Sequence, residues 1–371
     1  MINNKKIIII SAINLRSGGT LSILNDCLKF ADQNLFDNYR IIALVHKIDV
    51  VINTSNIEFL EFPKSISSYL YRLYYEYIYF KKISNKLKPY LWLSLHDMSP
   101  NVNATIQAVY CHNPSPFYKL RNKEVLLDIK FFLFTIFYKY LYRINIEKND
   151  YVIVQQEWLR EEFSKMYPIK KCIVAYPKIS SSLKNEQNYK KDNDKIFFYP
   201  SFPRVFKNFE IICEAVKELN RLNIKNFEVI ITIDGYENKY SDYIYNKYKN
   251  EPNIKFIGLQ TRENVFNLYS EADCLIFPSK LETWGLPISE FKEFNKPMIL
   301  ADLQFSHETI GEYDKVSFFN SNDSFELAKK MKMFLENSLI FKYHRVEKPS
   351  QPFAENWYEL FKILLKEEET I

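Results

Sequence analysis

Short apolar runs alternate with longer helix-like segments along nearly the whole chain, and this alternation limits the possible folds more than any other feature. It is the pattern of parallel strands joined by crossover helices, so the sequence predicts an α/β fold. Before residue 180, strands of a first sheet are expected at Ile7–Ala12, Arg40–Val45, Ile57–Phe62, Leu91–Leu95, Thr105–Tyr110 and Tyr151–Val154. Helices are expected between them at Leu21–Ala31, Ser68–Lys86, Lys123–Arg143 and Glu157–Met166.

A polar stretch, Ser180–Asp194, separates this series from a second one and predicts a linker. The second series predicts strands at Lys195–Tyr199, Glu228–Thr232, Ile254–Ile257, Cys274–Phe277 and Met298–Ala301. It predicts helices at Asn208–Leu222, Arg262–Ser270 with Thr261 as N-cap, Pro287–Phe294 and Ser324–Glu336. Because 371 residues exceed the size at which one core stops growing, about 250–300 residues, we expect two domains. These are residues 1–178 and 195–350, and a helix in 351–371 is expected to cross back to the first domain.

The composition indicates a soluble protein of a reducing compartment. Hydrophobic residues make up 47% and charged residues 26% of the chain, and no apolar run approaches the ~20 residues that a spanning helix needs. The apolar N-terminal run lacks the cleavage site of a signal peptide and reads as a buried strand. Five cysteines are scattered singly, without the spacing of a disulfide framework or a zinc site. We therefore expect a cytoplasmic location.

Basic charge is concentrated in the first half of the chain. Residues 1–180 hold 24 Lys and Arg against 15 Asp and Glu, whereas the remainder holds 26 against 30. Within this half, Tyr69–Lys88 and Lys119–Lys148 interleave aromatic and basic residues, which suits peripheral contact with an anionic inner-membrane surface. The alternative is that the aromatic faces only pack the domain and that the charge is ordinary solvated surface. Nucleic-acid binding is not expected, because no recognised module accompanies the charge.

The most informative motif is Phe277–Glu290, where a predicted strand ends, a glycine-containing loop follows and a helix begins at Pro287. Backbone N–H groups before a helix that starts with proline suit phosphate oxygens. Glu282 lies on the loop and Glu290 one turn inside the helix, so both carboxylates can approach a ligand at that place. They could accept hydrogen bonds from sugar and ribose hydroxyls. The alternative is a capped helix with two solvated acids.

Two glutamates separated by seven residues and enclosing Gly285, Leu286 and a proline resemble the signature of glycosyltransferase family 4. The resemblance continues through Lys296–Asp302, His307-Glu308 and Phe318–Asn322; it covers most of residues 195–335 well and 1–178 loosely. It implies the GT-B fold, two Rossmann-like domains facing each other across a cleft, with the donor bound by the second domain and the acceptor by the first. It further implies a retaining, metal-independent transferase without a cofactor, which agrees with the lack of an Asp-x-Asp triplet. Trp284, Gly285 and Leu286 are then expected at the donor.

The segment Tyr199–Asn208 carries a second resemblance, where the first strand of the second domain runs into a helix. The family places a lysine there to hold the donor diphosphate, and Lys207 fits. The family's arginine lies five residues earlier, where this chain has Phe202, and Arg204 is the candidate replacement. Two cations would stabilise the charge that develops on the leaving diphosphate. A solvated lysine at a helix start is the alternative.

Two motifs of the first half complete the resemblance. Ser17–Thr20 is similar to the family's glycine loop, which implies that Gly18 and Gly19 lie near the donor phosphates; alone, the glycine pair could be a tight turn. His112 follows a predicted strand, and the resemblance implies that it contacts the transferred sugar. A histidine that only satisfies loop backbone groups is the alternative.

The sequence thus predicts transfer of a hexose or related sugar from a nucleotide diphosphate sugar to a saccharide, expected to be lipid-linked, in surface polysaccharide or O-antigen assembly. Glu282 and His112 would be catalytic, with no metal. A nucleotide-sugar epimerase or phosphorylase would use the same fold. A non-catalytic protein that binds a sugar nucleotide or acts as a scaffold is the remaining alternative.

Overall fold

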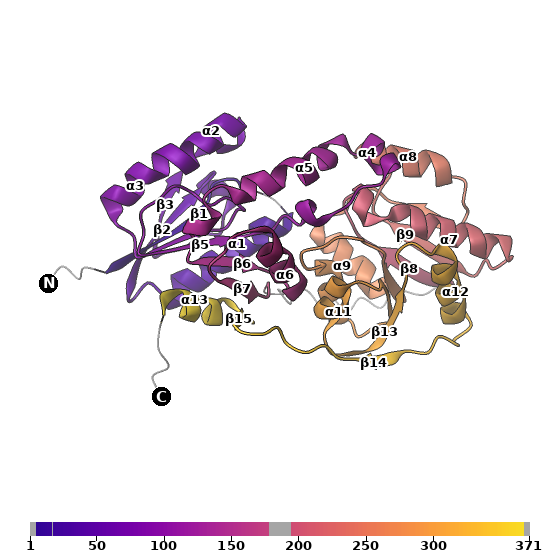
Figure 1. The fold of residues 1–371 in the computed structure, drawn as a ribbon. Coiled ribbons are helices and arrows are strands. Elements are labelled where there is room, and N and C mark those ends of the chain that lie inside the picture. The colour runs from indigo at the N-terminus through magenta and orange to yellow at the C-terminus, as the bar shows by residue number, and fades with distance from the viewer. Residues whose placement is uncertain (1–4, 17, 178–193, 367–371) are drawn as a thin grey trace. The chain divides into compact units, whose positions relative to one another are not determined.

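The computed structural model describes residues 5–16, 18–177 and 194–366. Its contacts divide the chain into two compact units (Figure 1). The first unit holds the described residues of 1–117, 135–178 and 348–371, and the second holds those of 118–134 and 179–347. Ser17 and all of the expected linker except Asp194 lie outside the described residues.

The first unit is built on an eight-stranded sheet in the order β15-β7-β6-β5-β4-β1-β2-β3, and every neighbouring pair is parallel. The strands are β1 Lys6–Ala12, β2 Tyr39–Val45, β3 Ile57–Glu61, β4 Leu91–Ser94, β5 Ile106–Tyr110, β6 Tyr151–Val154, β7 Cys172–Ala175 and β15 Phe353–Ala354. Strand β1 pairs with both β2 and β4, so the strand order reverses at β1. Ile8, Ile9 and Ile10 are fully buried, because an apolar run covered on both faces suits a central parallel strand.

Helices cover both faces of this sheet. The regular ones are α1 Gly18–Asn34, α2 Tyr69–Tyr74, α3 Phe80–Leu87, α6 Glu157–Met166, α13 Trp357–Leu365 and the part of α5, Ile129–Arg143, that follows Phe134. Short helical turns lie at η1 Ile48–Val50, η2 Pro63–Ile66, η3 Tyr75–Tyr79, η4 Ser115–Phe117 and η5 Ile146–Lys148. Side chains alternate across the sheet, so Ile8 and Ile10 meet α1 and α13 while Ile9 meets α3.

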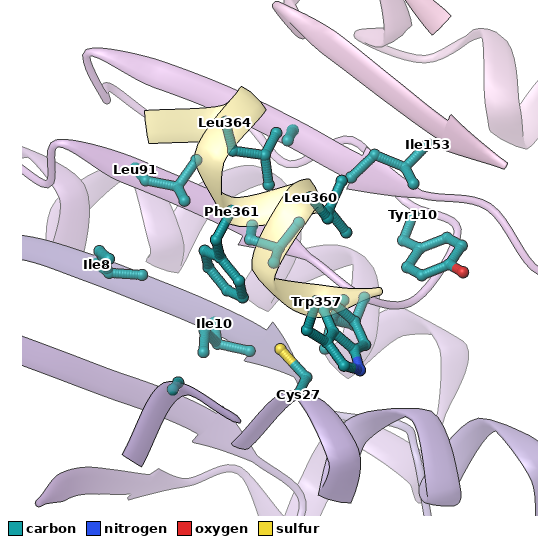
Figure 2. Close-up of a cluster of buried hydrophobic side chains, with 14 of the residues drawn as sticks. Ile8, Ile10, Cys27, Leu91, Tyr110, Ile153, Trp357, Leu360, Phe361 and Leu364 are labelled. Atoms are coloured by element: carbon teal, nitrogen blue, oxygen red, sulfur yellow. The ribbon is translucent and has the colours of Figure 1, made fainter. Parts of the chain in front are cut away.

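The last helix, α13, lies against the first sheet although it ends the described chain (Figure 1). Figure 2 shows Trp357, Leu360, Phe361 and Leu364 pointing into the cluster formed by the strands. The ring of Phe361 also stacks on a phenylalanine of α1, with centroids 5.5 Å apart. The core of the first unit is therefore completed by the C-terminal segment.

The second unit has a seven-stranded sheet in the order β10-β9-β8-β11-β12-β13-β14, parallel except for the antiparallel pair β13 and β14. The strands are β8 Lys195–Tyr199, β9 Phe227–Ile231, β10 Ile254–Phe256, β11 Cys274–Phe277, β12 Met298–Ala301, β13 Tyr313–Phe319 and β14 Lys342–His344. The helices are α4 Asn122–Leu127, the start of α5, η6 Val205–Lys207, α7 Phe209–Arg221, α8 Lys239–Tyr248, α9 Arg262–Glu271, α10 Leu286–Lys292, α11 Gln304–Ile310 and α12 Ser324–Leu335. Here the strand order reverses at β8, which lies between β9 and β11.

Two expected helices differ in the structure. The helix expected at Ser68–Lys86 has a π-helical middle, η3, in which Glu76 is fully buried. The helix expected at Lys123–Arg143 is interrupted at Asp128, whose backbone leaves the helical region and whose carboxylate accepts a hydrogen bond from the N–H of Phe131. Asp128 therefore begins a new helix, because it offers the backbone a local partner in place of the helical one.

Within the described residues, no helix combines the length and the apolar character that a bilayer span requires.

Candidate functional site

The strand order of the second sheet reverses between β8 and β11, and open α/β sheets bind ligands in the crevice beside the carboxyl ends of such strands. Two loops begin there, residues 200–208 after β8 and residues 278–285 after β11. They carry the lysine and the first glutamate singled out from the sequence. The topology therefore brings to one edge two motifs that are 75 residues apart.

Lys207 and Glu282 form an ion pair at this edge. The ammonium Nζ lies 2.5 Å from Oε1 of Glu282, and the side chains are 18% and 12% exposed. Most of each side chain is therefore covered by protein, and a small part of each remains exposed. The backbone of Lys207 is fixed as well, since its carbonyl accepts a hydrogen bond of 2.9 Å from the hydroxyl of the buried Tyr199.

Asn208 joins the two loops and was missed in the sequence analysis as a site residue. Its backbone is left-handed, with φ of 59°, a conformation that asparagine tolerates better than most residues. Its amide donates to the carbonyls of Pro278, at 3.1 Å, and Ser321, at 2.9 Å. A backbone bond from Lys280 to the carbonyl of Phe206, 2.8 Å, joins the loops a second time. The signal available in the sequence was an asparagine directly after Lys207, at the start of the predicted helix.

Gly285 precedes α10 and has φ of 93°, which side chains larger than hydrogen rarely adopt. A Cβ atom there would lie 3.3 Å from Cδ1 of Ile288. Its neighbour Trp284 is buried, and its indole N–H donates to Ser289 Oγ at 2.9 Å. Leu286 is the half-buried first residue of the helix. The structure thus gives Trp284 and Gly285 a role in shaping the loop that carries Glu282.

Glu290 lies on α10 and contacts α9. Its two carboxylate oxygens accept hydrogen bonds from Arg262 Nη2 and from the hydroxyl of Tyr269, both at 3.1 Å. Burial raises the pKa of Glu290, and Arg262 and Tyr269 oppose that rise. The structure therefore joins Lys207 to Glu282 directly, whereas Glu290 has partners of its own.

Arg204 also has a partner that the sequence did not suggest. Its Nη1 donates to both carboxylate oxygens of Asp128, at 3.3 and 3.1 Å, and its guanidinium lies 5.6 Å from the ring centroid of Phe202. Asp128 belongs to the segment Tyr118–Phe134 of the second unit. Arg204 is therefore anchored within the loop that also carries Lys207, and its contacts with Asp128 use Nη1 alone.

His112 follows β5 in the first unit. Its Nε2 lies 3.1 Å from the carbonyl oxygen of Leu95, so Nε2 carries the proton and Nδ1 keeps its lone pair. Nδ1 is buried and has no hydrogen-bond partner among the described residues. Burial lowers the pKa of His112, with Asp97 opposing this effect, so the ring is neutral near pH 7.

Asp97 is a second residue that the sequence analysis missed. It has a left-handed backbone, with φ of 67°, in the loop that follows β4. Its carboxylate accepts hydrogen bonds from the backbone N–H groups of His112 and Asn113 and from the hydroxyls of Tyr138 and Tyr142. The carboxylate of Asp97 therefore ties the His112 loop to α5, which carries both tyrosines.

Gly18 and Gly19 open α1 and are exposed. Gly18 has φ of 67°, and a Cβ atom there would meet no atom within 4 Å. Only the backbone conformation therefore calls for glycine at this position. Within the part of the chain that the structure describes, no three His, Cys, Asp or Glu side chains gather in the way that a metal site requires.

Comparison with known proteins places this geometry in context. Residues 180–351 match the sequence model of a family described as glycosyl transferases group 1. No curated protein matches the chain in sequence. Among solved structures, the chain is similar to a glycosyltransferase from Rickettsia africae ESF-5, with a TM-score of 0.63 and 16% identity over 90% of this chain and 89% of that one.

Two further structures are similar over 90% of both chains. Sucrose-phosphate synthase from Thermosynechococcus elongatus has a TM-score of 0.61 at 14% identity. HepE from Anabaena, solved in complex with UDP-glucose, has a TM-score of 0.59 at 13% identity. These likenesses confirm the predicted GT-B fold class, with its two parallel-rich α/β sheets. Lys207, Glu282 and Glu290 all lie within the segment that matches the family model.

Proposed function

We propose that the chain is a retaining glycosyltransferase of the family 4 type, which moves a hexose or related sugar from a nucleotide diphosphate sugar to a saccharide acceptor. The ion pair of Lys207 and Glu282 at the β8 and β11 edge carries this proposal. It supplies a cation for the donor diphosphate and a carboxylate for sugar hydroxyls, inside a segment that matches the glycosyl transferases group 1 model.

Charge governs the chemistry at this edge. As the bond between the anomeric carbon and the diphosphate breaks, its electron pair goes to the leaving oxygen, and Lys207 stabilises the charge that develops there. Glu282 orients the sugar through its hydroxyls. The departing oxygen takes the proton of the acceptor hydroxyl, whose oxygen bonds to the carbon on the same face. No side chain is needed as a nucleophile, and no metal is needed beside the cations.

The other residues are assigned supporting roles. Arg204, whose contacts with Asp128 use Nη1 alone, would add charge beside the diphosphate. Glu290 would accept a hydrogen bond from a ribose hydroxyl, since each of its carboxylate oxygens has one partner and a spare lone pair. His112 would accept a hydrogen bond from a hydroxyl of the transferred sugar through Nδ1, which has no hydrogen-bond partner among the described residues. Gly18 and Gly19 would lie near the phosphates, as the resemblance implies.

The proposed setting is the cytoplasmic face of a membrane, where a lipid-linked saccharide is extended in surface polysaccharide or O-antigen assembly. Exposed apolar side chains on α2, among them Tyr69 at 73% and Leu70 at 76%, support contact with a lipid surface. HepE was solved with UDP and with UDP-glucose, so uridine diphosphate sugars are the first donors to test.

The test begins by identifying the nucleotide, through thermal-shift titration with UDP, GDP, ADP and their sugar conjugates, because a bound nucleotide stabilises the fold by mass action. We then expect Lys207→Ala to weaken binding of that nucleoside diphosphate about tenfold or more, as loss of a charge-assisted hydrogen bond does. Glu282→Gln should keep nucleotide binding and lower kcat about 100-fold, because the sugar loses its orientation.

Matched controls are Lys217→Ala and Glu263→Gln, which change exposed residues on α7 and α9. Both should behave like the wild type. Wild-type transfer by a folded Glu282→Gln variant would refute the proposal. Tight donor binding without turnover on any acceptor would favour a non-catalytic protein, and dependence on orthophosphate would favour a phosphorylase.

A further inference from the structure

A cavity of about 300 Å³ lies in the first unit where β1 and β3 end. Its lining comes from the loop after β1, the loop after β3 and α2, and no acidic residue contributes to the lining among the described residues. The polar and charged side chains in it are Asn14, Arg16, Ser65, Ser67, Ser68 and Arg72. Two arginines without an opposing acid make this cavity suited to an anion.

Arg72 is held in place by groups behind the cavity. Its Nη2 donates to the carbonyl of His96 at 2.9 Å. In the amide orientation that satisfies its neighbours, Asn14 accepts from Nη1 and Nη2 of Arg72 at 3.1 and 3.2 Å. Nε of Arg72 is buried and has no hydrogen-bond partner among the described residues. The guanidinium is thus fixed before any ligand arrives, and one donor remains unsatisfied.

The charge of Arg72 is not cancelled by the ionisable groups packed against it. Glu76 is fully buried, and burial raises its pKa to about 8 although Arg72 opposes the rise, so the carboxyl is protonated near pH 7. His96, whose Nε2 lies 3.2 Å from Glu76 Oε1, is also buried, and this lowers its pKa well below the ordinary value. Both neighbours are therefore neutral, and the cavity keeps the full positive charge.

Arg16 and the hydroxyl of Ser68 are available to a ligand in this cavity, whereas the hydroxyls of Ser65 and Ser67 donate to the backbone carbonyls of Ile13 and Lys64. Arg16 is exposed and forms no hydrogen bond or ion pair with the described part of the chain. Ser68 Oγ accepts a hydrogen bond from the N–H of Leu70 at 3.1 Å, so its own proton is available to a ligand. Two guanidinium groups and one hydroxyl lining the same cavity match an anion with several oxygens, such as a phosphate.

We propose that this cavity binds a phosphate group carried by the acceptor. The proposal rests on the proposed function, in which the first unit binds the acceptor. The rim of the cavity includes the exposed side chains of Ile66 and Tyr69, so an apolar group attached to the phosphate would find apolar surface beside it. A lipid-linked phosphate and a soluble phosphorylated saccharide share the chemistry that the arginines recognise.

The first experiment measures phosphate binding directly. The full chain is saturated with the nucleotide found in the titration above, so that the Lys207 edge is occupied, and is then titrated with glucose 6-phosphate by calorimetry. We expect Arg16→Gln to weaken phosphate binding about tenfold and Arg16→Gln with Arg72→Lys to weaken it further. Lys29→Gln, which removes an exposed charge from α1 of the same unit, should leave it unchanged.

A second experiment distinguishes a lipid-linked phosphate from a soluble phosphorylated saccharide. Vesicles of phosphatidylcholine, with or without phosphatidic acid, are mixed with the same variants and floated. Binding to phosphatidic acid vesicles that depends on Arg16 supports the cavity and a lipid-linked phosphate. If only glucose 6-phosphate binds, and its binding depends on Arg16, the result supports the proposed cavity and indicates a soluble phosphorylated acceptor.

Equal phosphate binding by wild type and Arg16→Gln would overturn the inference while leaving the proposed function intact, because nucleotide binding and sugar transfer are measured separately. Loss of phosphate binding in Lys207→Ala, but not in Arg16→Gln, would also overturn it by assigning the phosphate to the donor edge. Nucleotide binding and the thermal midpoint of each variant show that it is folded.

Discussion

At the residue scale, polar side chains that follow the carboxyl ends of β4, β8 and β11 meet partners from distant parts of the chain. Lys207 meets Glu282, Arg204 meets Asp128, and Arg72 meets His96. Each contact crosses between loops or helices that follow different strands. A single strand end therefore holds too few groups for a site, and the parallel sheet supplies the rest by placing several strand ends side by side.

Glu76 provides a test of how the free energy of unfolding depends on pH. Burial raises its pKa from 4.5 to about 8, against the effect of Arg72. The folded state then binds the proton more tightly than the unfolded state, so the free energy of unfolding falls as the pH rises from about 4.5 to about 8. Glu76→Gln cannot ionise and escapes this loss. We expect its thermal midpoint to exceed that of the wild type by several degrees at pH 9, since each kcal/mol shifts such a midpoint by about 2–4 °C.

At pH 5 the advantage of Glu76→Gln should disappear, because the wild-type carboxyl is then protonated in the fold. Calorimetric scans at both values provide the measurement. Glu147→Gln, an exposed change in the same unit, should show no such difference between the two pH values. An equal shift at pH 5 and pH 9 would show that Glu76 does not titrate in this way.

A contact between two site residues could be predicted from the sequence only where each of the two residues lies in a recognisable motif. Lys207 and Glu282 each follow a clear apolar strand, so parallel topology predicts that they meet. Arg204 and Asp128 are 76 residues apart, and Asp128 lies in a segment that the sequence alone places with the first domain. Nothing local to Asp128 indicates that its carboxylate accepts from an arginine, because that contact exists only after folding.

At the scale of elements, the pattern of apolar residues predicted the bounds of strands well where the strand is buried along its whole length. The expected strands Tyr151–Val154, Cys274–Phe277 and Met298–Ala301 match the observed bounds, and Thr261 caps α9 by accepting from the N–H of Asn264. Helix α8 was not predicted, because its buried residues, Tyr240, Ser241, Ile244 and Tyr248, include only one aliphatic side chain and its composition is polar. Strand β13 was not predicted, because Asp314 and Lys315 interrupt its apolar pattern.

The segment Tyr118–Phe134 supports the loop that carries Lys207. The ring of Phe131 packs against Phe206, the residue before that lysine, with centroids 4.7 Å apart, and Tyr118 lies 6.3 Å from the same ring. Glu124 approaches Lys280 of the second loop at 3.7 Å. This segment therefore helps to position both loops of the proposed donor site, residues 200–208 and 278–285.

We expect Phe131→Ala to weaken nucleotide diphosphate binding severalfold and to lower the thermal midpoint, because a buried phenylalanine cut to alanine costs about 3–5 kcal/mol. Phe137→Ala, which changes an exposed ring on the same helix, should alter neither quantity. Calorimetric titration and thermal unfolding of both variants give the comparison. A lowered midpoint with unchanged nucleotide affinity would limit the segment to a purely structural role.

At the scale of the whole molecule, the chain passes between the two units more than once. Residues 118–134 belong to the second unit although residues on both sides belong to the first, and residues from Lys348 onward return to the first. Neither unit is therefore one continuous stretch of sequence. Alternating strands and helices indicate how many sheets there are, but the return of a segment depends on side-chain contacts that no local pattern records.

The C-terminal return suggests a last test. Trp357, Leu360, Phe361, Leu364 and Leu365 are all buried, and each such side chain contributes about 1.5–3 kcal/mol as an upper estimate. Their sum, about 8–15 kcal/mol, is comparable with the whole stability of a typical domain, about 5–15 kcal/mol. A chain ending at Glu355 should therefore lose the cooperative unfolding of its first unit.

The second unit offers an internal reference in the same sample, because the residues that make up the hydrophobic cluster completed by α13 all belong to the first unit. Nucleotide should still raise the midpoint of that unit in the shortened chain. Tyr358→Ser, which changes an exposed side chain of α13, should leave both transitions in place. A shortened chain that keeps the full unfolding enthalpy would mean that the five buried side chains contribute far less than their area implies, and that the first sheet is stable without α13.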